Sequence, residues 1–176
     1  MFRIYKETPK DFNEVEYLLD LAFAPGRSSL SSYRLRDGVD PVVDLSMIAR
    51  DEYDALSGSI RYWPVRIGPA GHPALLLGPV AVHPTRQGEG LGALLIQESL
   101  RRAFDRGWTR IILIGDEPYY RRYGFNREVM RDIEYPPPYN PDRLLGRALA
   151  PGAFRGVSGM VRNWRQAAEQ ARTATG

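Results

Sequence analysis

The sequence contains no cysteine and only two histidines, His72 and His83. Without cysteine there can be no disulfide bond, no zinc–thiolate site and no cysteine nucleophile. Two histidines are too few for a histidine-based metal site, because carboxylates would have to supply most of the ligands. We therefore expect a protein that works without a metal.

Long apolar runs are also missing from the chain. No stretch reaches the roughly 18 consecutive apolar residues that indicate a membrane-spanning helix. The N-terminal segment Met1–Lys6 lacks the apolar core of a signal peptide. The sequence therefore predicts no membrane partner and a cytoplasmic location.

What is present is typical of a globular protein. The 176 residues are 43% hydrophobic and 26% charged, with a net charge of +3. The basic residues are dispersed, which suits a small polyanionic ligand and predicts no nucleic-acid partner. We expect a single domain over residues 1–164, followed by a frayed helical tail over 165–176.

Hydrophobic periodicity and turn residues predict a chain in which strands and helices are mixed. Thr8 and Asp11 are candidate caps for the first helix, and Pro25-Gly26 ends it. A parallel strand–helix–strand unit is expected around the helix over 90–106. The predicted helices cover residues 12–22, 28–37, 90–106 and 119–123, and the predicted strands cover residues 2–6, 45–49, 56–67, 74–82, 108–114, 144–150 and 157–161.

Residues 77–92 form the most informative segment of the sequence. They read Leu-Gly-Pro-Val-Ala-Val-His-Pro-Thr-Arg-Gln-Gly-Glu-Gly-Leu-Gly, a buried strand, a polar turn with three alternate glycines, and the start of a helix. Glycines let the backbone approach a ligand and adopt a positive φ. The free N–H groups at a helix N-terminus attract anions, so the segment predicts a phosphate or pyrophosphate site.

Two families use a segment of this kind. Gly88-x-Gly90-x-x-Ala93, with Asp116 roughly 20 residues further on, fits a loose dinucleotide-binding fingerprint. Five residues, however, separate the strand from the first glycine, where a dinucleotide fold turns tightly. The alternative frame, Gln87-x-x-Gly90-x-Gly92, resembles motif A of the Gcn5-related N-acetyltransferases, and we favour it.

The resemblance implies an α/β fold with a mixed, mostly antiparallel sheet that is splayed at its centre and flanked by helices. It also implies acetyl-coenzyme A (acetyl-CoA) as co-substrate, with Gly78-Pro79 marking the bulge that opens the sheet. The peptide groups of Val80, Ala81 and Val82 would then bind the pantetheine arm. The implied pyrophosphate-binding residues are Gln87, Gly88, Glu89, Gly90, Leu91 and Gly92.

A second motif, Tyr120-x-x-x-Gly124-Phe125, is similar to the end of the short helix in these acetyltransferases. The wording of both motifs is closest to the YhbS-like branch of predicted acetyltransferases. The resemblance gives Tyr120 contact with the thioester sulfur and the role of protonating the departing thiolate. Tyr119 and Tyr123 are the alternatives. In water, a tyrosine of pKa about 10 protonates a thiolate near 8.5 at a cost of about 2 kcal/mol.

A general base is less clearly marked. Asp116 and Glu117 follow a predicted strand and are the candidates, although both could instead cap the short helix. His83 is expected to shape the turn with Pro84 rather than to act as a base. A base would matter most for a lysine-like amine, whose deprotonation at neutral pH costs roughly 4 kcal/mol, against about 1 kcal/mol for a peptide α-amine.

Three arginines are candidate partners for the phosphates of a ligand, namely Arg86, Arg121 and Arg122. Solvated surface positions are the alternative for each of them. No residue of the sequence stands out as a covalent nucleophile. The sequence therefore predicts direct transfer of an acetyl group from acetyl-CoA to a primary amine of a small molecule or peptide. A non-catalytic acyl-CoA sensor, an NAD-dependent oxidoreductase and a homodimeric state are left open.

Overall fold

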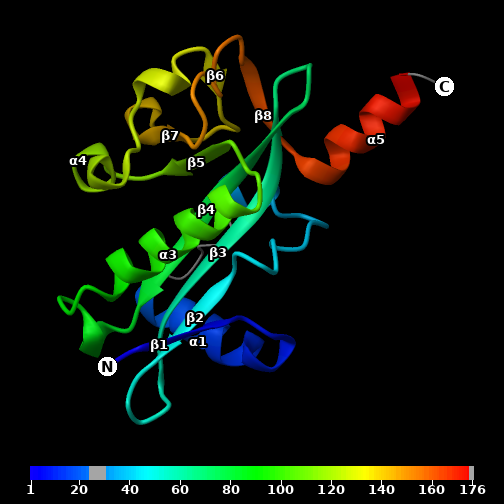
Figure 1. The fold of residues 1–176 in the computed structure, drawn as a ribbon. Helices are drawn as coiled ribbons and strands as arrows, with labels where there is room; N and C mark the ends of the chain where they lie inside the picture. The colour runs from blue at the N-terminus through cyan, green and yellow to red at the C-terminus, as the bar shows by residue number, and fades with distance from the viewer. Residues whose placement is uncertain (24–30, 175–176) are drawn as a thin grey trace. The chain divides into compact units, whose positions relative to one another are not determined.

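The computed structural model describes residues 1–23 and 31–174, which contain five α-helices and eight strands (Figure 1). The predicted Pro25-Gly26 break and the first part of the helix predicted over 28–37 lie outside the described residues. The helices are α1 (Phe12–Ala22), α2 (Ser31–Arg34), α3 (Leu91–Asp105), α4 (Glu117–Tyr120) and α5 (Trp164–Ala174). The strands are β1 (Arg3–Lys6), β2 (Met47–Arg50), β3 (Leu56–Ile67), β4 (His72–Val82), β5 (Arg110–Ile114), β6 (Ile133–Glu134), β7 (Leu144–Ala148) and β8 (Gly159–Asn163).

The strands form a mixed, mostly antiparallel sheet in the order β1-β2-β3-β4-β5-β7, with β8 paired to β3. The pairing between β4 and β5 is parallel, at Leu75–Ile111 and Leu76–Ile112. This pairing confirms the strand–helix–strand unit predicted from the sequence. Contacts along the chain divide it into two compact units, one of residues 1–27, 41–62 and 77–107 and one of residues 28–40, 63–76 and 108–176.

In the first unit, α1 and α3 pack on opposite faces of the sheet. Leu18 and Leu19 of α1 share a buried cluster with Ile48 of β2. Ile48 lies opposite Ser59 on β3, so the next residue, Gly58, points to the other face. There a Cβ on Gly58 would lie 2.9 Å from Leu91 of α3. The bare glycine therefore lets the start of α3 sit directly on β3.

The two predicted cap residues, Thr8 and Asp11, form a capping box at the 3₁₀ helix just before α1. The backbone N–H and the hydroxyl of Thr8 both donate to Oδ2 of Asp11, at 2.8 and 2.9 Å. Pro9 begins a short 3₁₀ helix between them, which leads directly into α1. Local residue types thus fix where this helix begins.

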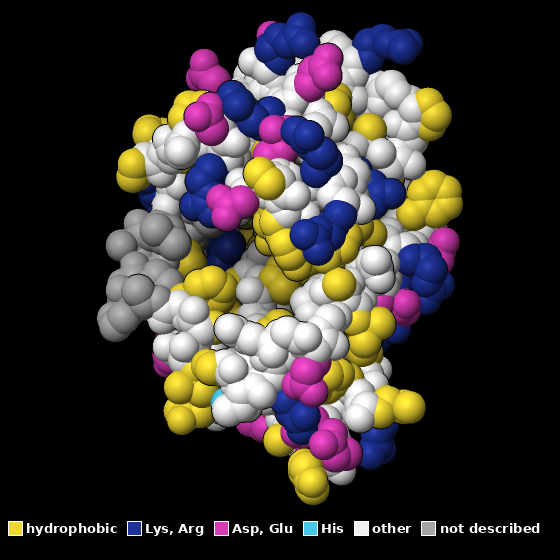
Figure 2. Space-filling model, turned by 90° about the vertical axis from the view of Figure 1, so that its left-hand side faces the viewer, with side chains coloured by type: hydrophobic (Ala, Val, Ile, Leu, Met, Phe, Trp, Pro, Cys, Tyr) yellow, Lys and Arg dark blue, Asp and Glu magenta, His cyan; other side chains and the backbone are white. Residues whose placement is uncertain are grey.

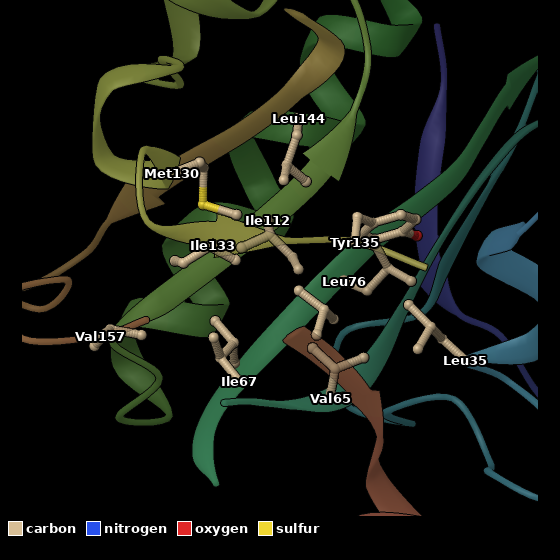
Figure 3. Close-up of a cluster of buried hydrophobic side chains, with 12 residues drawn as sticks. Leu35, Val65, Ile67, Leu76, Ile112, Met130, Ile133, Tyr135, Leu144 and Val157 are labelled. Carbon is tan, nitrogen blue, oxygen red and sulfur yellow. The ribbon is translucent and has the colours of Figure 1, made fainter. Parts of the chain in front are cut away.

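The second unit is built around its own apolar core (Figure 3). Side chains from β3, β4, β5 and β7 meet there with Tyr135 and Met130 from the intervening loops. The core residues include Val65, Ile67, Leu76, Ile112, Met130, Ile133, Tyr135, Leu144 and Val157. This packing fixes the carboxyl end of β5, and with it the start of α4.

Asn163 joins three segments of the second unit. Its side-chain N–H₂ donates to the carbonyls of Arg34, Leu35 and Asp37, while its Oδ1 accepts from two N–H groups at the start of α5. The predicted helical tail is therefore α5, which begins under this cap. Strand β6, which pairs in parallel with β8, was not expected from the sequence. Within the described part of the chain, no helix has the length and apolar character needed to cross a bilayer.

Candidate active site

The glycine turn before α3 adopts the conformation that its sequence predicts. Gly88 and Gly90 have φ of 84° and 79°, a region that favours glycine. A Cβ at either position would meet no atom of the chain within 4 Å. The backbone is therefore open to a ligand at both residues. Gly92, the third glycine of the segment, lies inside the first turn of α3.

The peptide N–H groups of Leu91 and Gly92 belong to the first turn of α3, where no intrahelical acceptor exists for them. The Leu91 side chain is 1% exposed and packs on β3. Leu91 can therefore meet a ligand through its backbone N–H and not through its side chain. A 15-residue helix carries a substantial positive end, so this turn favours an anion.

The strand that leads into the turn carries Val80, Ala81 and Val82 at the end of β4. Ala81 is buried with the α1 cluster, whereas Val80 and Val82 are partly exposed. Gly78, with φ of 137°, and Pro79 lie within β4 and are joined by a cis peptide bond. The splay expected at this point stays a prediction.

His83 shapes the turn, as the sequence predicts. Its Nδ1 accepts a hydrogen bond from the N–H of Thr85 at 3.2 Å, at the start of a short 3₁₀ helix over Pro84–Arg86. The N–H of His83 itself donates to the carbonyl of Ser57 at 2.8 Å. The bond to Thr85 assigns the imidazole to the structure of the turn.

Arg86 is committed to carboxylates of its own chain. Its Nη2 donates to Asp51 Oδ2 at 2.7 Å and to Glu52 at 3.2 Å, and its Nη1 lies 3.4 Å from Glu89. The guanidinium also lies over the ring of Phe2. This geometry therefore favours a structural, ion-paired role for Arg86 over the expected contact with ligand phosphates.

Asp51 is a residue that the sequence analysis did not single out. Its Oδ1 accepts from the N–H groups of Tyr53 and Ala55 at 2.9 Å each, which closes the turn between β2 and β3. These bonds and the nearby Arg86 guanidinium, which is the largest influence, lower the pKa of Asp51. The only sequence signal was the acidic turn Asp51-Glu-Tyr-Asp54.

In the second unit, Tyr120 covers the backbone at the carboxyl end of β5. A Cβ on Gly115 would lie 2.4 Å from Cε2 of Tyr120, so only glycine leaves room for the ring. The ring also meets Phe125 edge-on at 6.0 Å. Among residues 1–23 and 31–174, none forms a hydrogen bond with the Tyr120 hydroxyl. That hydroxyl is free to act on a ligand.

The two neighbouring tyrosines are placed differently. Tyr123 is 4% exposed, and its hydroxyl lies 3.4 Å from that of Tyr119. The Tyr119 ring is more exposed, and Cζ of Arg122 lies over it, 4.7 Å from the ring centroid. This arrangement favours Tyr120 as the tyrosine that meets a ligand. Burial, as the main cause, raises the pKa of Tyr120 to about 12.

Asp116 and Tyr120 are brought together through the backbone. The Asp116 carbonyl accepts from the N–H of Tyr120 at 3.0 Å, and the Asp116 carboxylate lies 3.3 Å from Nε of Arg143. The Glu117 carboxylate accepts from the N–H of Arg127 at 2.8 Å. Asp116 occupies the N-cap position of α4 as the alternative predicts, but its carboxylate makes no capping hydrogen bond there.

Charges of both signs are distributed over the surface. On the face shown in Figure 2, basic and acidic side chains of the described residues are intermixed, and no broad area carries one sign. Arg121 pairs with Glu117 at 3.4 Å and is 72% exposed, so it behaves as a surface arginine. Within the ranges 1–23 and 31–174, no three His, Asp or Glu side chains are grouped to hold a metal ion.

The sequence of this chain is similar to a family model and to curated proteins. A family model described as an acetyltransferase (GNAT) domain, the Gcn5-related type, matches residues 3–127. The uncharacterised N-acetyltransferase YhbS of Escherichia coli K12 is 26% identical over 155 residues, which cover 88% of this chain and 92% of YhbS.

Two solved structures are similar over most of the chain. A crystal structure of E. coli YhbS in complex with CoA has a TM-score of 0.79 and 25% identity, covering 92% of this chain and 89% of that one. A GNAT family acetyltransferase from Brucella melitensis in complex with acetyl-CoA has a TM-score of 0.64 and 32% identity, covering 86% and 90%.

Proposed function

The chain belongs to the GNAT acetyltransferase family, and from that premise we propose that it transfers an acetyl group directly from acetyl-CoA to a primary amine. The observation that carries the proposal is the glycine turn before α3, where the backbone at Gly88 and Gly90 is open to a ligand. Relatives with solved structures bind CoA and acetyl-CoA. Acetyl-CoA supplies an activated thioester, and the chain supplies binding, orientation and proton transfer.

The turn residues would bind the pyrophosphate. The N–H groups from Gln87 to Gly92 and the positive end of α3 are the donors, and no arginine is required among them. Glu89 contributes its backbone only, because its carboxylate lies beside Arg86. The peptide groups of Val80, Ala81 and Val82 are the proposed partners of the pantetheine arm.

Tyr120 is the proposed acid for the thiolate. With a pKa of about 12, its proton lies about 5 kcal/mol uphill of a thiolate of ordinary pKa 8.5. Burial raises the pKa of a thiol as well, so the difference within a desolvated site is smaller. We infer that the Tyr120 hydroxyl donates a hydrogen bond while charge develops on sulfur, and that its proton moves late.

Asp116 is the proposed base or positioning group for the amine. Its carboxylate stands at the start of α4 and is 74% exposed, so it can reach a ligand or a water molecule. No covalent intermediate is required, because holding two reactants together supplies much of the rate. The acetyl group would then pass from sulfur to nitrogen, with one proton leaving the amine and one reaching the thiolate.

The test of this function is a pair of measurements on the parent protein. Acetyl-CoA should raise the melting temperature, and NAD should not. At a hundredfold excess over Kd, bound acetyl-CoA should add about 2.7 kcal/mol to the free energy of unfolding. Thioester consumption should then depend on an added amine. A shift with NAD alone would overturn the proposal, and binding without turnover across a broad amine panel would favour an acyl-CoA sensor.

A further inference from the structure

A hollow of about 510 Å³ opens in the second unit beside the candidate catalytic residues. One wall is the corner from Gly115 to Tyr119, where β5 turns into α4, and the other is formed by Arg127, Asp142 and Arg143. The N–H of Gly115 donates to the carbonyl of Arg143 at 2.9 Å, which holds the two walls together. The volume lies within the range of about 300–1,000 Å³ that is usual for small-molecule sites.

The hollow shares residues with the surroundings of Tyr120. Tyr119, in its wall, meets the Tyr120 ring edge-on at 4.9 Å, and Gly115 underlies that ring. Asp116, the candidate base, is itself a wall residue. A ligand in this hollow therefore lies against the same short corner that carries the proposed acid and base.

The wall presents two ion pairs of matched charge. Asp116 lies 3.3 Å from Arg143, and Asp142 lies 2.7 Å from Arg127. All four side chains are exposed, by 48% to 74%. Exposed ion pairs of this kind contribute little to stability, so a ligand that offers both charges can replace one of them at low cost.

We propose that this hollow binds the acceptor, and that the acceptor is a small zwitterion: an amine that also carries a carboxylate, such as an α-amino acid. The inference rests on the proposed acetyl transfer and adds a substrate class to it. The ammonium group would lie on Asp116 and the carboxylate on Arg143. Arginine is suited to this role because its fork of donors matches a carboxylate.

Acceptors of a single charge fit the wall less well. A polyamine bound to Asp116 would leave Arg143 without the partner that it now has at 3.3 Å, and a purely anionic ligand bound to Arg143 would leave Asp116 in the same position. A second hollow, of about 630 Å³, shares Glu117 and Arg127 with the first. It gives a zwitterion room for a longer side chain.

The experiment compares acceptors that differ only in the carboxylate. Thioester consumption is measured with phenylalanine against phenethylamine and with lysine against cadaverine, and binding of the same compounds is measured by titration in the presence of CoA. The expected result is a preference for the carboxylated member of each pair of at least tenfold in kcat/KM. The Arg143→Gln variant should lower that preference by about tenfold, mainly through KM.

Two controls keep the outcome specific. Arg101→Gln removes an exposed, ion-paired arginine from α3 and should leave the preference unchanged. If Arg143 acted only by holding Asp116, Arg143→Gln would slow both members of each pair equally, and the zwitterion assignment would fall. The melting temperature of the variant checks its folding.

The remaining outcomes separate the two proposals. A parent protein that acetylates phenethylamine and cadaverine as fast as the amino acids contradicts the zwitterion but supports acetyl transfer. The same holds if acetyl-CoA is turned over with other amines while no amino acid is consumed or bound. A parent protein that neither binds nor consumes acetyl-CoA contradicts the proposed function itself.

Discussion

Arg86 and Asp51 are 35 residues apart in the sequence, and their side chains meet at 2.7 Å. The same carboxylate closes the turn between β2 and β3 through the N–H groups of Tyr53 and Ala55. The glycine turn is thereby fastened to the hairpin formed by β2 and β3. We expect Arg86 to act on coenzyme affinity through the position of this turn.

Replacing Arg86 by Gln should weaken acetyl-CoA binding by about tenfold, or 1.4 kcal/mol, because the turn loses its anchor. Asp51→Asn should have a similar effect, and Arg106→Gln, which removes an exposed arginine at the far end of α3, should not. The measurement is a titration with CoA and with dephospho-CoA. If Arg86 touched the 3′-phosphate directly, the loss would be much smaller with dephospho-CoA.

Gly90→Val should weaken coenzyme binding by tenfold or more, because its side chain enters the space where the ligand approaches the backbone. Gly107→Val is a matched control at the other end of α3. Gly107 also has a positive φ, 87° against 79° for Gly90, and also faces open space. Both variants should lose about 1–2 kcal/mol of stability from backbone strain. Equal affinity in the two folded variants would contradict the phosphate site.

Tyr120→Phe should lower kcat by about 10²-fold, since the hydroxyl matters when charge develops on sulfur. The ring keeps its packing on Gly115, so CoA affinity should stay within about threefold. Tyr119→Phe and Tyr123→Phe remove hydroxyl groups that already face each other at 3.4 Å, and should do much less. Steady-state kinetics with one identified amine decide the matter. Unchanged turnover in all three variants would remove the tyrosine mechanism.

The pH dependence follows from the raised pKa of Tyr120, which is about 12. The acid stays protonated through the working range, so kcat should show no decline between pH 8 and 10 from loss of this proton. Unfolded tyrosine titrates near 10. The ionisation of Tyr120 therefore lowers the free energy of unfolding as the pH rises from about 10 towards 12, and this group has no effect on it below that range. A kcat decline centred near pH 9 that Tyr120→Phe abolishes would contradict this assignment.

Local signals in the sequence predicted much of the fold. Strand β3 has the bounds predicted from the sequence, residues 56–67, and α3 differs from its predicted range by one residue at each end. The positive φ of Gly88, Gly90 and Gly124 follows from residue type and position. Each of these features depends on neighbours within a few residues, which a single sequence displays directly.

Contacts between distant segments could not be predicted in the same way. The Arg86–Asp51 pair joins two surface turns, and nothing in either turn indicates the other. The hollow proposed to bind the acceptor depends on Asp142 and Arg143, which lie about 26 residues after Asp116 in a segment without periodicity. Strand β6 is two residues long and carries no pattern. Tertiary packing decides all three, so the structure was needed to find them.

Gly58 has a consequence for how this protein would respond to directed evolution. The empty position on β3 receives Leu91, whose side chain is buried while its N–H faces the turn that leads into α3. Alanine at this position would place its Cβ 2.9 Å from Leu91, so it would force the first turn of α3 away from β3. A library selected for heat resistance and a library selected for turnover should therefore both keep glycine here.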